Sequence, residues 1–263
     1  MFFAFLNFVG VFAFILFYLC RSLANNIRMK YIIAAYLWFI SYTFLIIFLL
    51  WFLLVSVIFP RDTYMRWVRA YLRLYFKLLF IKVKVTGTEN IDPNKTYVFM
   101  SNHVSMYDIP LLLGFIPVDF YGIQAAHHFK VPIYGHVLKA YGNIPIDRSN
   151  ARASYRTIQG AVEHLKSGKN IMILPEGTRS RKPVMGPFKK LPFVMVKRAE
   201  VNILPFAFSG LWSINNKTSK MIRPGTVHIH FGEAISDEVV KNSTEEELIK
   251  LTRECIQSYI TEP

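Results

Sequence analysis

The sequence predicts an α/β domain with a largely parallel central sheet flanked by helices, preceded by N-terminal membrane-embedded helices. From residue 81 onward, short apolar runs typical of buried strands alternate with helical stretches, which is the pattern of a parallel sheet. Hydrophobic residues make up 53% of the chain, and their excess lies before residue 61. We therefore divide the 263 residues into a membrane-embedded helical segment, residues 1–60, an amphipathic interfacial helix, residues 61–80, and a globular domain, residues 81–263.

The membrane-embedded segment contains two apolar runs. Residues 2–20 form a run of about 19 mostly apolar residues, and residues 31–59 form a 29-residue run without any charge. A helix needs about 20 apolar residues to span a bilayer, so the second run is long enough and the first is marginal. A cleaved signal peptide is the alternative for the first run. No positive segment precedes it, however, and residues 20–23 make a poor cleavage site, so we expect a retained anchor.

The net charge of +14 is unevenly distributed. Residues 1–84 hold ten basic residues and one acid, a net charge of +9. Beside two apolar runs, this charge favours an anionic membrane surface over nucleic acid as the partner. Seven of the ten basic residues follow the second run, so the positive-inside rule predicts that everything after Pro60 lies on the cytoplasmic side.

The loop between the two runs is itself basic, with Arg21, Arg28 and Lys30. This charge leaves two arrangements open. Either both runs span the membrane, or residues 31–59 dip into the membrane and return to the same face.

Residues 61–80 predict an amphipathic helix in the headgroup plane. Apolar residues repeat there at helical spacing beside a stripe of basic residues. The alternative is a helix whose apolar face packs on its own domain, and both interpretations can hold at once. The apolar residues are Met65, Val68, Leu72, Tyr75, Phe76 and Leu79, and the basic residues are Arg66, Arg69, Arg73 and Lys77.

The globular domain shows seven strand-like runs separated by helical stretches. The predicted strands are residues 81–86, 96–100, 118–121, 143–146, 170–174, 201–206 and 226–231. The predicted helices are residues 133–140, 151–167, 188–199 and about 245–260. The last helix begins with Thr244 and Glu247 in the spacing of a capping box.

Residues 101–108 carry a histidine and a carboxylate five residues apart, His103 and Asp108. Five helical residues would set the two side chains about 140° apart, so they can meet only if the chain turns between them. Because the stretch follows a predicted strand and precedes a helical run, we expect Asp108 in the first helical turn and His103 in the loop. A carboxylate bonded to one imidazole nitrogen makes the other nitrogen a stronger base. The pair therefore suits general-base activation of a substrate hydroxyl.

A second stretch, residues 174–180, reads L-P-E-G-T-R-S and also follows a predicted strand. Together with N-H-x-x-x-x-D at residues 102–108, it resembles the glycerolipid acyltransferase family, whose enzymes acylate lysophosphatidic acid and related lysolipids. The family has phenylalanine where this chain has Leu174. Two further family blocks have counterparts at residues 142–148, G-N-I-P-I-D-R, and 201–205, V-N-I-L-P. The resemblance implies that residues 81–263 are an acyltransferase catalytic domain. Because family members have an N-terminal two-helix element embedded in one leaflet, the second arrangement of residues 31–59 stays open beside the first.

The resemblance also implies transfer of a fatty acyl group from an acyl-CoA or acyl carrier protein thioester to a lysophospholipid hydroxyl. The acceptor we expect is 1-acylglycerol 3-phosphate, which would give phosphatidic acid. The G-x-S-x-G elbow of hydrolases is absent, and Cys20 and Cys255 are badly placed to act as nucleophiles. We therefore expect direct attack by the acceptor hydroxyl, with His103 as general base and Asp108 orienting it. The thioester is a co-substrate, and no further cofactor is expected.

The phosphate of the acceptor needs cations and hydrogen-bond donors. Arg179 is the first candidate because a guanidinium matches phosphate oxygens bidentately, and Arg148 is the second, with a surface ion pair as its alternative. Gly177 lets the backbone approach closely, so that amides near it can donate. Glu176 is expected to orient an arginine or to accept from a glycerol hydroxyl. The predicted substrate-binding residues are Arg148, Glu176, Gly177, Thr178 and Arg179.

One departure from the family pattern bears on the acceptor. Many members carry a lysine pair where this chain has Ala125-Ala126, followed by His127, His128 and Lys130. The change weakens the case for lysophosphatidic acid and leaves open another lysolipid, such as a lyso-aminolipid. A non-catalytic lipid-binding membrane protein is a further alternative, which the intact motif residues disfavour. No metal site is expected, because the adjacent residues His127 and His128 would rarely both reach one ion. No nucleotide-binding motif is present in the sequence.

Overall fold

The computed structural model describes residues 27–147, 149–219 and 221–261. In this part of the chain, seven strands form one sheet in the order β1-β7-β6-β2-β5-β3-β4. The ladder between β6 and β7 is antiparallel and the other five are parallel, which confirms the predicted α/β fold with a largely parallel sheet. The strands are β1 (Ile81–Thr86), β2 (Tyr97–Met100), β3 (Tyr121–Ala125), β4 (Ile144–Ile146), β5 (Ile171–Ile173), β6 (Asn202–Ser209) and β7 (Gly225–Phe231).

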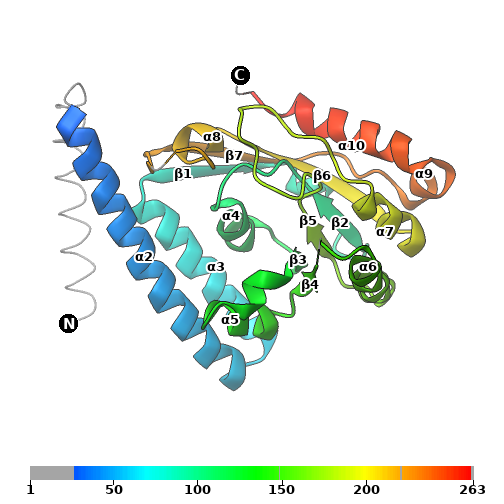
Figure 1. Cartoon of the computed structure of the whole chain (residues 1–263), viewed down its shortest axis with the longest axis horizontal. Coiled ribbons are helices and arrows are strands. Elements are labelled where there is room, and N and C mark those ends of the chain that lie inside the picture. Colours follow the sequence, from blue (N-terminus) through cyan, green and yellow to red (C-terminus); the bar gives the residue numbers. More distant parts are fainter. Residues whose placement is uncertain (1–26, 148, 220, 262–263) are drawn as a thin grey trace.

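Helices cover both faces of the sheet (Figure 1). Along β2, Tyr97 and Phe99 point into the layer of α2, α3, α4 and α5, whereas Val98 and Met100 point into the layer of α6, α7, α9 and α10. The first layer consists of α2 (Ile27–Ile58), α3 (Arg61–Leu78), α4 (Asp108–Phe115) and α5 (Tyr134–Tyr141). The second consists of α6 (Ala151–Lys166), α7 (Leu191–Ala199), α9 (Asp237–Asn242) and α10 (Glu245–Ser258). Short helical turns η1 (Thr88–Asn90), η2 (Ala126–Lys130) and α8 (Leu211–Ile214) complete the described chain.

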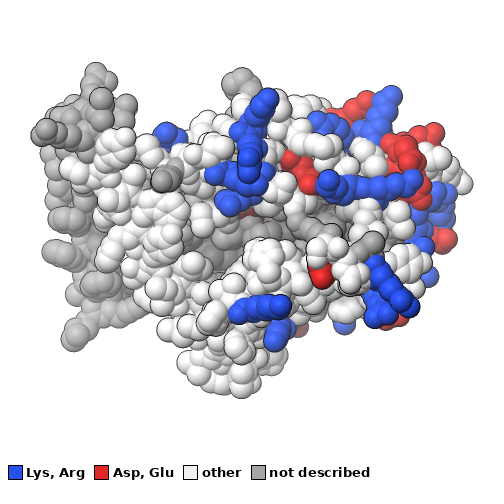
Figure 2. Space-filling view, viewed as in Figure 1, with Lys and Arg blue, Asp and Glu red and all other residues white. Residues whose placement is uncertain are grey.

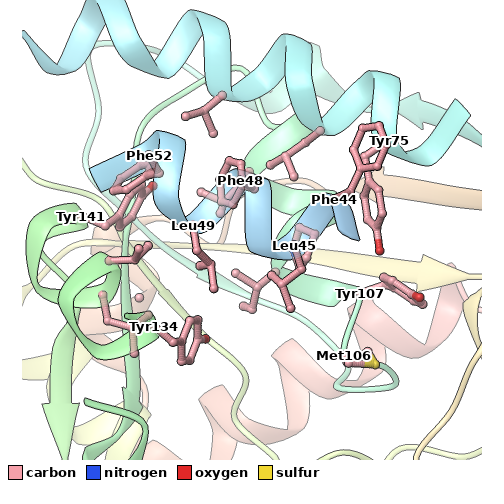
Figure 3. Close-up of a pocket in the computed structure, with 18 of the residues that line it drawn as sticks. Phe44, Leu45, Phe48, Leu49, Phe52, Tyr75, Met106, Tyr107, Tyr134 and Tyr141 are labelled. Carbon is pink, nitrogen blue, oxygen red and sulfur yellow. The ribbon is translucent and has the colours of Figure 1, made fainter. Parts of the chain in front are cut away.

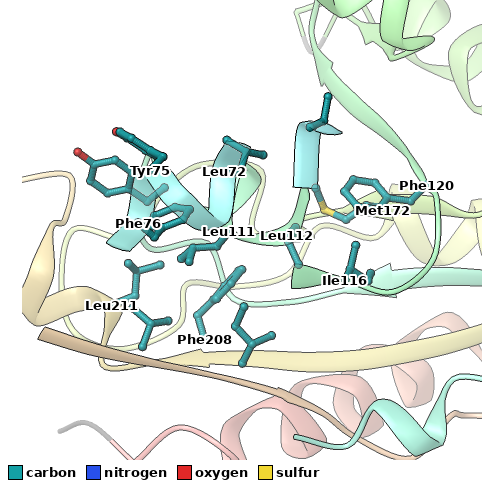
Figure 4. Packing of buried hydrophobic residues seen from close by; sticks show 14 of the residues in the cluster. Leu72, Tyr75, Phe76, Leu111, Leu112, Ile116, Phe120, Met172, Phe208 and Leu211 are labelled. Atoms are coloured by element: carbon teal, nitrogen blue, oxygen red, sulfur yellow. The ribbon is translucent and has the colours of Figure 1, made fainter. Parts of the chain in front are cut away.

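α4 lies between α3 and the sheet (Figure 4). Leu111 and Leu112 of α4 are fully buried between Leu72 of α3 and Phe208 of β6. Gly114 permits the close approach of α3, because a Cβ at this position would lie 3.1 Å from the Cβ of Leu72. Packing on both sides therefore fixes α4, whose first residue is Asp108.

α2 is one uninterrupted helix of 32 residues. Among the described residues, it is the one helix that is long and apolar enough, over Tyr31–Ile58, to cross a membrane. It contains no proline or glycine and does not fold back on itself, so a return of residues 31–59 to the same face of the membrane would need more than this run. Arg28 and Lys30, expected in a loop, belong to the first turns of α2. The first apolar run, residues 2–20, and Arg21 lie outside the described residues.

α2 lies along the domain rather than projecting from it. Leu37, Ile40 and Phe52 are buried in the core that α2 shares with α3 and α5. The opposite side of α2 exposes large apolar residues, among them Phe39, Ile46, Leu50 and Leu54. In Figure 2 the surface on the α2 side carries almost no charge, whereas Lys, Arg, Asp and Glu gather over the half of the molecule that holds α7, α9 and α10.

The predicted amphipathic helix is α3, and its apolar face packs on its own domain. This outcome matches the alternative interpretation of residues 61–80. In the basic stripe, Arg66 and Lys77 are exposed, whereas Arg69 donates to Asp119 Oδ1 at 2.6 Å and Arg73 to the carbonyl oxygen of Gly114 at 2.8 Å. The buried residues of α3 are Tyr64, Met65, Val68, Leu72, Tyr75 and Phe76. Contact of the exposed cations with a lipid surface stays a prediction.

Arg61 fastens the start of α3 to the edge of the sheet. Its guanidinium carbon lies 4.5 Å from the ring centre of Tyr121 and 4.4 Å from that of Tyr141. The same group donates to Asp119 Oδ2 at 3.2 Å and to the carbonyl oxygen of Tyr141 at 2.7 Å. Asp119 therefore binds both Arg61 and Arg69 and fixes α3 against the loop that precedes β3.

Most predicted elements agree with the structure to within three residues, and the capping box at Thr244 and Glu247 is confirmed. The predicted strand at residues 118–121 is wrong, because β3 occupies Tyr121–Ala125. Gly122 and Ala125 have low strand propensity, and the segment extends because it pairs with β5 on one side and β4 on the other. β6 continues three residues past its predicted end because residues 206–209 pair with β7. α8 and α9 are too short to leave a periodic pattern.

We predict that Asp119→Asn destabilises the fold by about 2 kcal/mol, because two half-buried arginines lose their shared counter-ion. The melting temperature in detergent should fall by about 4–8 °C. Glu254→Gln is the control, because its partner Lys250 lies 4.0 Å away and both side chains are more than half exposed. That change should leave the melting temperature nearly unaltered. Equal melting temperatures for the Asp119 variant and the unaltered protein would contradict a structural role for the contacts of Asp119 with Arg61 and Arg69.

Candidate active site

The candidate site lies where three neighbouring strands end. β6, β2 and β5 are adjacent in the sheet and run parallel, so the loops that follow them meet at one edge. The loop after β2 holds His103, the loop after β5 holds residues 174–180, and the loop after β6 leads through α8 to Asn215. Both motifs predicted from the sequence therefore lie at one edge of the sheet.

His103 and Asp108 form a hydrogen-bonded pair, with Nδ1 of His103 2.6 Å from Oδ2 of Asp108. As expected, the chain turns between them, since Asp108 begins α4 and His103 lies in the preceding loop. The turn is held by the carboxylate itself, because the backbone N–H groups of Val104 and Ser105 donate to Asp108 at 2.9 and 3.0 Å. The side chain of His103 is 22% exposed, and its Nε2 has no hydrogen-bond partner among the described residues.

Asp108 is completely buried. Burial raises the pKa of its carboxyl above the usual range, and the hydrogen bonds from His103, Ser105 and Val104 oppose that shift. The carboxylate that accepts these bonds holds the proton of His103 on Nδ1, so Nε2 carries the free lone pair. The pair therefore presents a base toward the surface of the loop.

Asn102 ties the loop of His103 to β6. Its side-chain amide donates to the carbonyl oxygen of Phe208 at 2.9 Å and its Oδ1 accepts from the N–H of Phe208 at 2.9 Å. The side chain thus extends the β2–β6 ladder beyond the end of β2. This reciprocal bonding gives a physical reason for asparagine directly before the histidine.

Glu176 ties the loop of His103 to the loop after β5. It is 4% exposed, and its Oε1 accepts from the backbone N–H of His103 at 2.7 Å. Its Oε2 accepts from the hydroxyl of Ser180 at 2.6 Å and from the N–H of Gly186 at 2.7 Å. The N–H of Ser180 in turn donates to the carbonyl oxygen of His103 at 2.8 Å. We expected Glu176 to orient an arginine or to accept from a glycerol hydroxyl, but its partners are backbone amides and a serine.

Two of the remaining predicted binding residues, Gly177 and Arg179, follow Glu176 in the same loop. Gly177 has a φ of 72°, which glycine adopts without strain, and its N–H closes a turn onto the carbonyl oxygen of Leu174 at 2.9 Å. That amide is therefore engaged inside the protein. Arg179 is half-buried, and neither its guanidinium nor its backbone N–H has a hydrogen-bond partner among the described residues. Arg148 lies outside the described residues.

A cavity of about 530 Å³ with a largely apolar lining lies between α2, α3, α4 and α5 (Figure 3). Met106 and Tyr107, from the loop that carries the dyad, line one end, and Phe52 and Tyr141 line the other. α2 supplies much of the wall, including Phe44, Leu45, Phe48 and Leu49. A volume of this size is typical of a small-molecule site, roughly 300–1,000 Å³.

A buried polar contact connects α2 to the dyad loop. The hydroxyl of Ser41 lies 2.8 Å from the hydroxyl of Tyr75 in α3 and 2.8 Å from that of Tyr107. Tyr107 directly precedes Asp108, so α2 contacts the residue at the start of α4. Buried hydroxyls that satisfy one another in this way fix a single packing of the three segments.

Several of these contacts are not predicted from the sequence. Ser41 is a polar residue inside an apolar run, which marks it as unusual without naming a partner. Asn215 is 2% exposed, and its Oδ1 accepts from the hydroxyl of Ser105 at 2.9 Å. The run N-N-K-T-S-K at residues 215–220 indicates a loop, but pairs this far apart in the sequence appear only once the strand order is known.

We predict that Glu176→Gln loosens the loop of His103, because an amide NH2 replaces an oxygen that accepts hydrogen bonds. Each charge-assisted bond contributes about 1–3 kcal/mol, so amide hydrogen exchange at His103 and Gly186 should accelerate at least about tenfold. Hydrogen-exchange mass spectrometry of peptides covering residues 101–108 and 180–187 measures this. Glu254→Gln in α10 is the matched exposed control. Unchanged exchange in both peptides would contradict the proposed tie.

This chain is similar to known proteins of one family. The sequence profile of the acyltransferase family matches residues 82–209, which hold both motifs. The 1-acyl-sn-glycerol-3-phosphate acyltransferase of Borreliella burgdorferi is 30% identical, over 72% of this chain and 76% of its own. That of Pseudomonas aeruginosa is 31% identical, over 68% of each chain. That of Chlamydomonas reinhardtii is 30% identical over 69% of this chain, which spans only 54% of the algal protein.

The fold also matches a solved structure. The crystal structure of the 1-acyl-sn-glycerophosphate (LPA) acyltransferase PlsC from Thermotoga maritima superposes with a TM-score of 0.74 at 25% identity, over 87% of this chain and 93% of that one. The bacterial relatives match over two thirds or more of their own length. This chain therefore belongs to the acyltransferase family.

Proposed function

We propose that this protein transfers a fatty acyl group from an acyl-CoA or acyl carrier protein thioester to the free hydroxyl of 1-acylglycerol 3-phosphate, giving phosphatidic acid. The observation that carries the proposal is the His103–Asp108 pair, an imidazole that is 22% exposed and whose Nδ1 is bonded to a buried carboxylate 2.6 Å away. Relatives named for this activity and the solved structure support the substrate class. The thioester is a co-substrate, and the proposal involves no other cofactor.

In the proposed reaction, His103 Nε2 takes the proton of the acceptor hydroxyl while its oxygen attacks the thioester carbonyl carbon. The tetrahedral intermediate collapses by breaking the carbon–sulfur bond, and the imidazolium returns the proton to the leaving sulfur. Asp108 keeps the imidazole in the required tautomer and stabilises its charged form between the two steps. No covalent acyl-enzyme is needed, because the two substrates react directly with each other.

Arg179 is the proposed ligand of the acceptor phosphate. It lies three residues from Glu176, whose contact with the backbone of His103 holds the two loops together. A guanidinium without a partner among the described residues can bind phosphate oxygens bidentately. The backbone N–H of Thr178 has no partner among the described residues and is a further candidate donor.

The apolar cavity is the proposed site for the acyl chain of the donor. One end adjoins the loop of the dyad, so a chain lying in the cavity would leave its thioester near His103. Each methylene that moves from water into an apolar site contributes about 0.8 kcal/mol. The length of the cavity would therefore set the preferred chain length.

α2 is the proposed membrane anchor, with the catalytic domain on the cytoplasmic side. Its outward face is apolar, and the basic residues that follow residue 60 support this orientation. Membrane phospholipids would then surround α2, and the lipid acceptor would reach the site from the same surface. Proximity to the bilayer supplies part of the catalytic advantage, since the acceptor is concentrated there.

We predict that His103→Ala lowers kcat for transfer to lysophosphatidic acid by about 10²–10⁴-fold, because the general base is lost. Arg179→Ala should chiefly raise the KM for lysophosphatidic acid. Purified protein in detergent, one acyl-thioester donor and a panel of lysolipids give both measurements.

The same panel distinguishes the alternatives. Preference for a lysolipid without a phosphomonoester would be consistent with the proposed mechanism but would exclude lysophosphatidic acid as the main acceptor. The alanines at Ala125-Ala126 leave the identity of the acceptor open. Absence of transfer to any acceptor, from a preparation of well-folded protein, would support a non-catalytic lipid-binding protein instead.

We predict that Leu49→Trp shifts the donor preference toward shorter acyl chains, because the larger side chain projects into the middle of the cavity (Figure 3). Losing the burial of two to four methylenes should lower kcat/KM for the longest donors about 10–100-fold. A series of acyl-CoA donors of increasing length measures the shift. Leu50→Trp, on the exposed side of α2, is the control and should leave the preference unchanged.

A further inference from the structure

The loop after β6 reaches the site from the side opposite to Ala125-Ala126. In the strand order β6-β2-β5-β3, the loop holding Thr178 lies between the end of β3 and the loop after β6. β3 ends at Ala125, so this side of the site has no cation at the two positions where many family members carry lysines. The loop after β6 carries Lys217, whose side chain contacts Thr178 in the motif at residues 174–180.

The segment around Lys217 is held in place by its own hydrogen bonds. Asn215 is buried, accepts from the hydroxyl of Ser105 at 2.9 Å and donates to the carbonyl oxygen of Met221 at 3.1 Å. Oδ1 of Asn216 accepts from the N–H of Thr218 at 3.0 Å and from the N–H of Ser219 at 2.9 Å. Lys217 therefore projects from an ordered turn that is fastened to the dyad loop.

The ammonium of Lys217 lies 2.7 Å from the hydroxyl oxygen of Thr178. Within the described residues, no carboxylate lies within 4.0 Å of it, whereas Lys190, Lys241 and Lys250 each have at least one. Thr178 directly precedes Arg179, whose guanidinium has no carboxylate partner in the described part of the chain either. Two cations thus lie at one short segment where the described residues supply no anion to balance them, an arrangement that attracts an anionic ligand.

From this geometry we infer that Lys217 binds a substrate phosphate together with Arg179 and supplies the positive charge absent from Ala125-Ala126. This inference rests on the proposed function and adds a residue to it. An ammonium binds an anionic phosphate oxygen more strongly than a neutral hydroxyl, so the contact with Thr178 gives way when the phosphate arrives. The phosphate belongs either to the lysolipid acceptor or to the nucleotide part of coenzyme A.

Kinetics with matched substrates test the inference. The acceptors are lysophosphatidic acid and monoacylglycerol, which differ by the phosphate, and the donors are acyl-CoA and acyl-pantetheine, which lacks phosphate. The variants are Lys217→Ala and Lys217→Arg. Lys241→Ala is the control, because this lysine lies in α9 and pairs with Glu200.

Lys217→Ala should raise the KM for lysophosphatidic acid about 10-fold or more, with kcat changed by less than about threefold, because a charge-assisted bond is lost. Transfer to monoacylglycerol should be unaffected, and Lys217→Arg should keep most of the affinity. If the phosphate is that of the donor, the KM for acyl-CoA rises instead and that for acyl-pantetheine does not. Either pattern supports a phosphate ligand at Lys217.

Equal effects on lysophosphatidic acid and monoacylglycerol with both donors, or no effect at all, would overturn the inference. If His103→Ala abolishes acyl transfer while Lys217→Ala changes no KM, the proposed function is supported and the role of Lys217 is excluded. If the unaltered protein transfers no acyl group, the proposed function falls. Direct binding of lysophosphatidic acid and of coenzyme A in detergent then decides the role of Lys217. Dissociation constants that Lys217→Ala leaves unchanged for both ligands would exclude it.

Discussion

The two carboxylate oxygens of Glu176 are the constraint on which the candidate site depends. β2 and β5 lie side by side, but pairing between strands does not determine where the loops beyond them go. One buried carboxylate accepts from the amide of His103, the hydroxyl of Ser180 and the amide of Gly186, and so fastens the two loops to each other. Burying a charge is costly unless hydrogen bonds compensate for it, and here three donors do so.

The His103–Asp108 pair is supported in the same way from its other sides. Asn102 fastens the loop to β6, Asn215 fastens it to the segment that carries Lys217, and the amides of Val104 and Ser105 fold the loop around Asp108. The loop that holds the imidazole is therefore bonded to β6, to the segment after α8 and to the start of α4. A general base needs this fixed orientation more than it needs a large shift in its own proton affinity.

Much of the fold could be predicted, because its signals are local. Apolar runs gave most of the strands, and the spacing of Thr244 and Glu247 gave the start of α10. β3 could not be predicted, since Tyr121–Ala125 is extended only by its neighbours in the sheet. In the site, the turn between His103 and Asp108 followed from helix geometry alone. The position of Glu176 did not, because its partner at His103 lies 73 residues away in the chain and depends on the strand order.

Within the described residues, α2 forms one wall of the cavity, and its opposite face is exposed. Phe48 and Leu49 line the cavity, while Leu50 and Leu54 are exposed. Truncation to obtain a water-soluble enzyme would therefore remove a wall of the cavity along with the apolar helix. Exchange of the helix for an anchor from another protein would have the same result. In the proposed function one helix serves both membrane attachment and chain selection, so removal of the whole helix would abolish both.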